Sequence, residues 1–177
     1  MNRRVLTSFP TLTTERLELR RLFEEDKQEI FDLRNDERVN LYLDRERPEN
    51  IQDAIDFIRH INKGIEEGQN FYWVICRRTN PRLLGTICLY NFSEEEQSAE
   101  IGFELSSEAQ GMGLMKEAIP AVIQFAFSQL PLVRLDAFTR TENSRSIQLL
   151  ERNNFIFQSE TPGENNQLNR IYFLRKE

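Results

Sequence analysis

The sequence predicts an α/β (α+β) protein with a mixed, mainly antiparallel seven-stranded sheet that has helices packed on both faces. Three observations lead to this prediction. Short segments rich in β-branched and aromatic residues alternate apolar with polar positions, as half-buried strands do. Longer segments place their apolar residues at helical spacing. Hairpins come early in the chain and strands then alternate with helices, an order typical of a mixed sheet.

The length of 177 residues predicts one compact domain spanning 1–177. A net charge of −6 argues against a nucleic-acid-binding surface, although an acidic rim would attract an amine or a cationic peptide. No apolar run has the length of a membrane span, and the N-terminal residues lack the apolar core of a signal peptide. We therefore expect a cytoplasmic monomer or homodimer with no nucleic-acid or membrane partner.

Cysteine and histidine are too few to predict a metal site or a disulfide framework. Cys76 and Cys88 lie in apolar runs, which favours buried, reduced thiols over a disulfide or a nucleophile. With one histidine, His60, the sequence has no zinc-ligand spacing, and we expect that side chain at the surface of a helix. No metal is expected.

The periodicity predicts each element in turn. The expected strands are residues 14–22, 70–77, 83–92, 98–105, 132–139, 155–159 and 170–174. The expected helices are residues 24–35, 51–65, 114–130 and 143–153. Pro48 lies near the start of the second helix and Gly68 just past its end, as helix boundaries favour. Pro120 falls inside the third helix, where it removes one backbone hydrogen bond and should either kink the helix or destabilise it by about 3 kcal/mol.

The stretch SSEAQGMGLMKEA, residues 106–118, carries two closely spaced glycines just before a predicted helix. A Rossmann fingerprint would need a third glycine where Lys116 stands, and a P-loop would need Gly-Lys-Ser/Thr. Two interpretations remain. The segment is a loop whose amides and following helix attract an anion, or it is a simple strand-to-helix turn.

This stretch, with the strand before it and Glu117-Ala118 in the helix after it, resembles the acetyl-CoA-binding core of the GNAT N-acetyltransferase superfamily. The resemblance implies that backbone amides hold the pyrophosphate of coenzyme A. The implied cofactor-binding residues here are Gln110, Gly111, Met112, Gly113, Leu114 and Met115. Gln110 and Gly113 match the Gln/Arg-x-x-Gly-x-Gly/Ala loop of that family, whereas Met115 stands where Gly or Ala is usual.

Three further segments carry the resemblance, which covers roughly residues 10–175. Residues 99–105 (AEIGFEL) resemble the family's fourth strand, whose splayed end accepts the pantetheine arm through backbone groups. The resemblance therefore implies pantetheine contacts at Phe103 and Leu105. Asn143-x-x-Ser146 with the following SIQLLERNNF, and TERLELRRL near the start, resemble the RimJ/RimL-type branch, which acetylates protein N-termini. Asn154 replaces a glycine usual in that branch, a mild change because Asn tolerates the left-handed conformation.

Acetyl transfer to an amine needs a base, a stabilised oxyanion and a proton for the leaving thiolate. We expect Glu100 to be the general base, directly or through water, with Glu104 as the second choice. Ser146 is the candidate proton donor, and Asn143 could contact the pantetheine arm, which makes both implied cofactor-binding residues. The alternatives are an exposed strand carboxylate for Glu100, local backbone bonds for Ser146 and a plain helix cap for Asn143.

The polar segment 35–50 is the expected acceptor-recognition loop. Its carboxylates Asp36, Glu37 and Asp44 either attract an amine or form an ordinary solvated face. The leading hypothesis is an acetyl-CoA-dependent N-acetyltransferase whose acceptor is a protein or peptide N-terminal α-amine. The alternatives are a small amine acceptor, such as a polyamine, an amino acid or an aminoglycoside, and a non-catalytic acyl-CoA-binding regulator.

Overall fold

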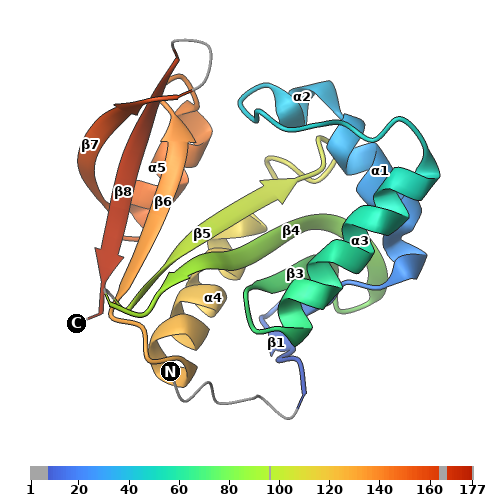
Figure 1. Ribbon diagram of the computed structural model, residues 1–177, viewed down its shortest axis with the longest axis horizontal. Coiled ribbons are helices and arrows are strands. Elements are labelled where there is room, and N and C mark those ends of the chain that lie inside the picture. The colour runs from blue at the N-terminus through green and yellow to red at the C-terminus, as the bar shows by residue number, and fades with distance from the viewer. Residues whose placement is uncertain (1–7, 96, 164–166, 177) are drawn as a thin grey trace.

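The computed structural model describes residues 8–95, 97–163 and 167–176. One eight-stranded sheet runs through them in the order β1-β2-β3-β4-β5-β6-β8-β7 (Figure 1). The strands are β1 (Leu12–Thr13), β2 (Leu17–Arg21), β3 (Phe71–Arg77), β4 (Asn80–Ser93), β5 (Ser98–Leu105), β6 (Arg134–Arg140), β7 (Ile156–Pro162) and β8 (Leu168–Arg175). All neighbours pair antiparallel except β5 and β6, which are parallel.

Helices cover both faces of this sheet. They are η1 (Glu24–Asp26), α1 (Lys27–Asn35), α2 (Glu37–Asn40), α3 (Ile51–Glu66), α4 (Met115–Gln129) and α5 (Ser144–Arg152). Figure 1 shows α3 in front of β3 and β4, with α4 behind the sheet. None of the helices that the structure describes combines the length and the apolar content that crossing a membrane requires.

Strand alternation builds a separate core on each face. On β3, Trp73 and Ile75 pack with α4 and α5 in the larger core, whereas Tyr72, Val74 and Cys76 pack with α1 and α3 in the smaller one. This division follows from the two-residue period of a strand, because successive side chains point to opposite faces. The predicted packing of helices on both faces is confirmed.

The sheet opens between its two parallel strands. β5 pairs with β6 only over Ser98–Glu100, opposite Arg134–Asp136. β5 nevertheless stays paired with β4 as far as Leu105, and β6 stays paired with β8 as far as Arg140. The two halves of the sheet therefore diverge beyond Glu100, as Figure 1 shows, and leave backbone groups of β5 and β6 without a strand partner at the open end.

The predicted mixed, mainly antiparallel sheet is confirmed, but its predicted count of seven strands is wrong. The additional strand is β1, whose two residues are too short to produce an alternation signal. The predicted 35–50 loop contains the four-residue helix α2, which is likewise too short for a periodic pattern. β4 begins at Asn80, so the turn after β3 is shorter than expected.

Several local predictions are confirmed by the backbone. Asn143 Oδ1 accepts a hydrogen bond from the amide of Ser146 and caps α5. Gly68, just past α3, has φ +68°, and Asn154, past α5, has φ +64°. Both lie in the left-handed region that ends helices. Pro120 lies inside α4, which continues across it.

Candidate functional site

The loop that joins β5 to α4 presents a row of free backbone amides. Gly111 and Gly113 have φ +78° and +72°, a region that glycine enters without steric cost. Among the described residues, no protein acceptor pairs with the amide N–H groups of residues 111–115, a set that includes Met112, Leu114 and Met115. These donors lie at the N-terminal end of α4, where the helix dipole adds positive potential. The arrangement suits a phosphate or pyrophosphate.

A clasp from the N-terminal strands fixes the direction of those amides. The Arg16 guanidinium donates to the carbonyls of Met112 and Gly113, each at 3.2 Å. The same guanidinium forms an ion pair with Glu117 in the first turn of α4. Thr14 Oγ1 also donates to Glu117 Oε2 at 2.6 Å. In a trans peptide the N–H points away from the C=O. Because Arg16 holds the carbonyls of Met112 and Gly113, the N–H groups of the same peptides point to the opposite side of the loop, where a ligand can bind.

Burial and these hydrogen bonds act on Glu117 in opposite directions. Burial raises the pKa of its carboxyl, whereas the hydrogen bonds from Thr14 and Arg16 lower that pKa by a larger amount. The pKa of Glu117 therefore lies below its ordinary value. Glu117 is therefore held as a carboxylate. This clasp could not be predicted from the sequence, since its members are about 100 residues apart along the chain.

Gln110 connects the loop to the far side of the opening in the sheet. Its side-chain amide donates to the Leu105 carbonyl at the end of β5, at 3.1 Å. Arg145 in the first turn of α5 donates to Gln110 Oε1 at 3.0 Å. The structure thereby brings the glycine loop, the end of β5 and the start of α5 together, as the sequence pattern implied.

The departure at Met115 has a structural explanation. Its side chain and that of Leu114 are buried in the larger core, against the sheet. Any contact of these two residues with a ligand therefore runs through the backbone, which is the same for Met as for Gly or Ala. Lys116 is exposed, so its charge lies at the surface beside the loop.

Asn143 and Ser146 lie together at the start of α5, which follows the open end of β6. Both side chains are partly buried. The side-chain oxygen of Asn143, Oδ1, accepts the hydrogen bond of the helix cap, so the capping interpretation is correct. Its amide N–H2 and the Ser146 hydroxyl have no hydrogen-bond partner among the described residues and can serve a ligand.

Glu100 lies at the closed end of the opening, in the last register pair that joins β5 to β6. Its carboxylate accepts a hydrogen bond from the Asn91 side chain at 3.0 Å. It lines a cavity of about 430 Å³ together with Arg134 and Asp136, which are paired with each other. Burial and the adjacent Glu100 charge raise the pKa of Tyr90. Glu100 and Ser146 lie on different elements and share no hydrogen bond in the described chain.

Glu104, the second candidate base, is engaged elsewhere. Its carboxylate forms an ion pair with Arg45 at 2.8 Å, and both side chains are less than one-fifth exposed. Thr86 Oγ1 donates to the same carboxylate at 3.2 Å. Because Arg45 and Thr86 already occupy this carboxylate, it is less accessible to an amine, so the geometry favours Glu100 over Glu104.

The two cysteines are free thiols, as predicted. Desolvation by burial raises the pKa of Cys76, and it raises the pKa of Cys88 to about 12. A thiol with a raised pKa is a poor nucleophile. His60 is exposed on α3, also as predicted.

The carboxylates predicted for the acceptor loop have different surroundings. Asp36 caps α2 and accepts hydrogen bonds from the amide and hydroxyl of Ser107. Although burial opposes it, these bonds lower the pKa of Asp36. Glu37 is exposed, whereas Asp44 forms an ion pair with Arg140 at the end of β6. Asp36 is therefore structural, and Asp44 is the carboxylate that faces the opening.

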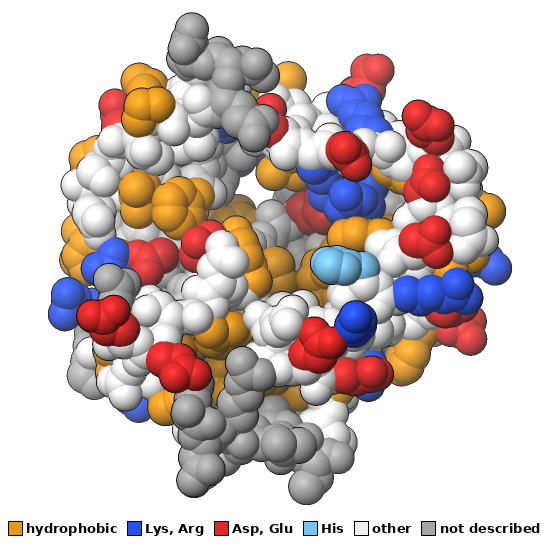
Figure 2. Space-filling model, viewed as in Figure 1, with side chains coloured by type: hydrophobic (Ala, Val, Ile, Leu, Met, Phe, Trp, Pro, Cys, Tyr) orange, Lys and Arg blue, Asp and Glu red, His pale blue; other side chains and the backbone are white. Residues whose placement is uncertain are grey.

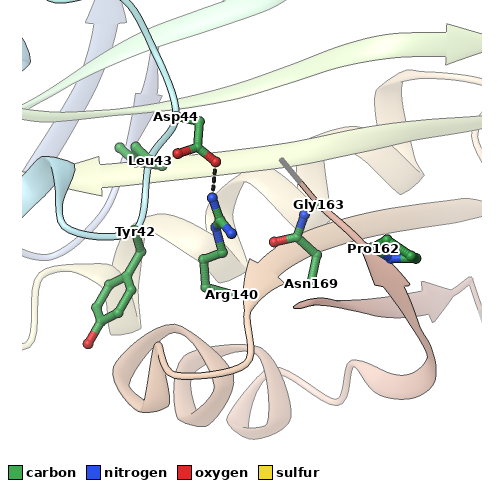
Figure 3. A pocket seen from close by; sticks show the side chains of 7 residues that line it. All are labelled: Tyr42, Leu43, Asp44, Arg140, Pro162, Gly163 and Asn169. Carbon is green, nitrogen blue, oxygen red and sulfur yellow. Dashed lines mark hydrogen bonds and ion pairs between the residues drawn. The ribbon is translucent and has the colours of Figure 1, made fainter. Parts of the chain in front are cut away.

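Figure 2 shows the molecule hollowed between the part built from β6, β7 and β8 and the part that carries α1 and α3. Two segments bound this hollow at its open end, the loop after α2 and the ends of β7 and β8. They line a cavity of about 470 Å³ (Figure 3). The site thus has a phosphate-type loop, a split sheet beside it, and a cavity at the open end.

A model of the acetyltransferase (GNAT) domain matches residues 16–156. The chain belongs to the GNAT family of acetyltransferases. Among curated proteins, an uncharacterized N-acetyltransferase of Bacillus subtilis, YoaA, is 32% identical and aligns over 89% of this chain and 94% of its own length. The N-acetyltransferase p20 of Bacillus licheniformis is 36% identical over 85% of this chain and 83% of its own length.

Solved structures share the GNAT fold at lower sequence identity. RimL, a ribosomal L7/L12 α-N-protein acetyltransferase solved with coenzyme A, superposes with a TM-score of 0.83 at 17% identity, covering 94% of this chain and 98% of that one. A ribosomal-protein-S5-alanine acetyltransferase from Vibrio fischeri superposes with a TM-score of 0.82 at 18% identity, covering 94% and 96%. At these identities the superpositions show the shared fold.

Family and site agree on the chemistry. This GNAT chain is an N-acetyltransferase, and its cosubstrate is acetyl-CoA. The residues that the structure describes fit that cosubstrate, because five free amides at the start of α4 suit its pyrophosphate and the opening beside β5 suits an extended arm.

Proposed function

We propose that this enzyme acetylates the N-terminal α-amine of a protein or peptide, and that its loop, split sheet and first turn of α5 form one active site. The observation that carries the proposal is the row of unpaired amides at residues 111–115 beside the open end of β5. All the proposed groups belong to one chain, so a monomer suffices and a homodimer would hold two such sites. We assign the activity to the cytoplasm, as the sequence indicates.

Coenzyme placement follows from the unpaired backbone groups. The amides of residues 111–115, after Gln110, would bind the pyrophosphate, with Arg16 and Glu117 as positioning residues that hold the loop. The pantetheine arm would then run along the open edge of β5, where Phe103 and Leu105 have lost β6 as a neighbour. An extended arm bearing two amide groups can hydrogen-bond to such an edge as a strand does.

Residues at the two sides of the opening would carry out the transfer. Glu100 would take the proton from the attacking amine, directly or through a water molecule. As the amine nitrogen bonds to the thioester carbon, backbone amides of β5 would stabilise the negative charge that develops on the carbonyl oxygen. The bond between that carbon and sulfur would break when the tetrahedral species collapses. Ser146 would return a proton to the leaving thiolate, and the Asn143 amide would orient the arm beside it.

The choice of acceptor rests on the relatives and on the cavity at the open end. The RimL and S5-alanine enzymes are named for acetylating ribosomal proteins. In this chain the cavity opens to solvent beside Asp44, a position that suits the flexible end of a protein chain. A carboxylate there attracts an amine.

An acceptor screen tests the function. Purified protein with acetyl-CoA is assayed for free thiol in the presence of N-terminal peptides, polyamines, amino acids and aminoglycosides. We expect thiol release only when an acceptor is present, with the highest kcat/KM for the peptides. Preference for a small amine would replace the proposed acceptor. Tight coenzyme binding without thiol release for any acceptor would indicate a non-catalytic binding protein.

A further inference from the structure

Arg140 is a buried cation with an unused hydrogen-bond donor. It is the last residue of β6, and its side chain is 4% exposed. One terminal nitrogen, Nη2, donates to Asp44. The other, Nη1, is buried and has no hydrogen-bond partner among the described residues. Leaving a buried N–H of a guanidinium unpaired costs free energy, and such groups in native proteins call for an explanation.

Arg140 lines the cavity at the open end of the sheet. That cavity is lined by Tyr42, Leu43, Asp44, Arg140, Pro162, Gly163 and Asn169. In Figure 3 the Arg140 side chain reaches toward Asp44 with one nitrogen, while the other turns toward the side of the cavity where Asn169 lies. An acceptor atom of a ligand in this cavity would complete the hydrogen bonding of the guanidinium.

The surrounding charges indicate which acceptor atom suits Nη1. Asp44 already compensates the positive charge of Arg140, so the pair as a whole is neutral. A second carboxylate would bring an uncompensated negative charge, whereas a neutral carbonyl oxygen would not. Asp44 is 41% exposed and has a further oxygen available to accept from an amine N–H. The pair therefore offers a donor for a carbonyl and an acceptor for an amine at one place.

The position of this pair relative to the opening favours a role in acceptor binding. Asp44 contacts the end of β6 through Arg140, and the next residue, Arg45, contacts β5 through Glu104. The segment after α2 therefore crosses the gap between the two diverging strands. An acceptor held at Asp44 would enter the gap from its open end, and because Glu100 lies at the closed end, the amine proton would reach Glu100 through water.

We propose that Arg140 and Asp44 form a subsite for an α-amino carbonyl group, with Asp44 accepting from the amine and Arg140 Nη1 donating to the carbonyl oxygen of the first residue. This inference rests on the proposed function, and it states why that function would select an α-amine. The amine and carbonyl of a peptide N-terminus are separated by one carbon, so one pair of side chains can bind both. A lysine side chain or a polyamine has no carbonyl at that place.

Two variants and three acceptors test the subsite. The acceptors are glycinamide as the head of a peptide, ethylamine as its counterpart without the carbonyl, and free glycine with a carboxylate. Each variant is compared with wild type on the same acceptor, so differences in amine basicity cancel. Arg140→Lys keeps a positive charge for Asp44 but loses the second nitrogen. We expect kcat/KM for glycinamide to fall about tenfold or more and that for ethylamine to stay within twofold.

Asp44→Asn is the second variant. Because Asp44 is partly exposed, we expect this variant to fold. It leaves the Arg140 charge uncompensated, so the ratio of kcat/KM for free glycine over glycinamide should rise about tenfold. Arg170→Lys is the matched control, because Arg170 lies on β8, is paired with Glu160 and is more exposed. We expect it to leave every kcat/KM unchanged.

The outcomes separate this inference from the function beneath it. Suppose that the wild-type enzyme acetylates amines. If Arg140→Lys lowers kcat/KM equally for glycinamide and ethylamine, the proposed subsite is wrong and the proposed function stands. The same conclusion follows if Asp44→Asn leaves the ratio of kcat/KM for free glycine over glycinamide unchanged. A wild-type preference for free glycine over glycinamide also overturns the subsite. If wild type binds coenzyme A and acetylates none of the three, the proposed function fails first.

Discussion

Arg16 and Glu117 lie 101 residues apart in the chain and form an ion pair beside the loop of residues 110–115, which we propose binds coenzyme A. While Glu117 holds the guanidinium, its remaining N–H groups draw the Met112 and Gly113 carbonyls to one side. The amides of the same peptides are then exposed on the other side, where no protein acceptor among the described residues meets them. A salt bridge outside the active site thereby prepares the loop for a pyrophosphate.

We expect Arg16→Met to weaken coenzyme A binding about tenfold, because the loop carbonyls lose their common partner and the amides lose their alignment. Isothermal titration with coenzyme A measures the change. Arg59→Met is the matched control, since Arg59 on α3 forms an exposed ion pair with Glu24 in η1, away from the loop. Equal affinities for both variants would remove the clasp from the account.

The Glu117 carboxyl gives the protein a pH-dependent contribution to stability. Its pKa in the folded state lies below its ordinary value of 4.5, so the contribution is present above that value and is lost as the pH falls through the folded-state pKa. Glu117→Gln should lower the free energy of unfolding at pH 7 by about 1–2 kcal/mol. Urea unfolding from pH 7 down to pH 3 should show the difference shrinking toward the acid end. A difference that stays constant with pH would contradict this assignment.

Gly113 tests whether the loop backbone binds the coenzyme. A β-branched residue at positive φ is strained, so Gly113→Val should shift the amides and weaken coenzyme A binding at least tenfold. Gly68→Val imposes the same strain at φ +68°, past the end of α3. Both variants should lose similar thermal stability, but we expect reduced coenzyme affinity only for Gly113→Val. Loss of affinity in both would point to a general loss of folding instead.

Glu100 should matter for turnover and little for coenzyme binding. Glu100→Gln removes the basic group but keeps an acceptor for the Asn91 amide, so we expect kcat to fall roughly 10²–10⁴-fold with unchanged coenzyme affinity. Glu160→Gln on β7, an exposed carboxylate paired with Arg170, is the control and should keep wild-type turnover. Wild-type kcat in Glu100→Gln would make this residue a strand carboxylate only.

The elements that could be predicted from the sequence are those with long periodic patterns. The alternation of residues 98–105 predicted β5 to the residue, and the apolar stripe over 51–65 predicted the helix α3, although not its exact ends. β1 and α2 were missed because two and four residues cannot establish a period. The glycine spacing predicted a loop between β5 and α4, and Gly111 and Gly113 there have the positive φ that glycine adopts without strain.

The site could be predicted only where its chemistry is local in the chain. The Asn143 cap on Ser146 spans three residues, and the sequence pattern contained it. The Arg16–Glu117 and Asp44–Arg140 pairs join segments about 100 residues apart, and single charged residues are too common for such pairings to be read. The opening between β5 and β6 also depends on tertiary pairing, so the resemblance implied it and the residue pattern did not.

One peptide can show whether the enzyme acetylates an N-terminal α-amine. A peptide with a free α-amine and an internal lysine is incubated with acetyl-CoA and the enzyme, and tandem mass spectrometry then locates the acetyl group. We expect one acetyl group on the α-amine, with one free thiol released per peptide modified. Acetylation of the lysine alone, or thiol release that leaves the peptide unmodified, would contradict this expectation.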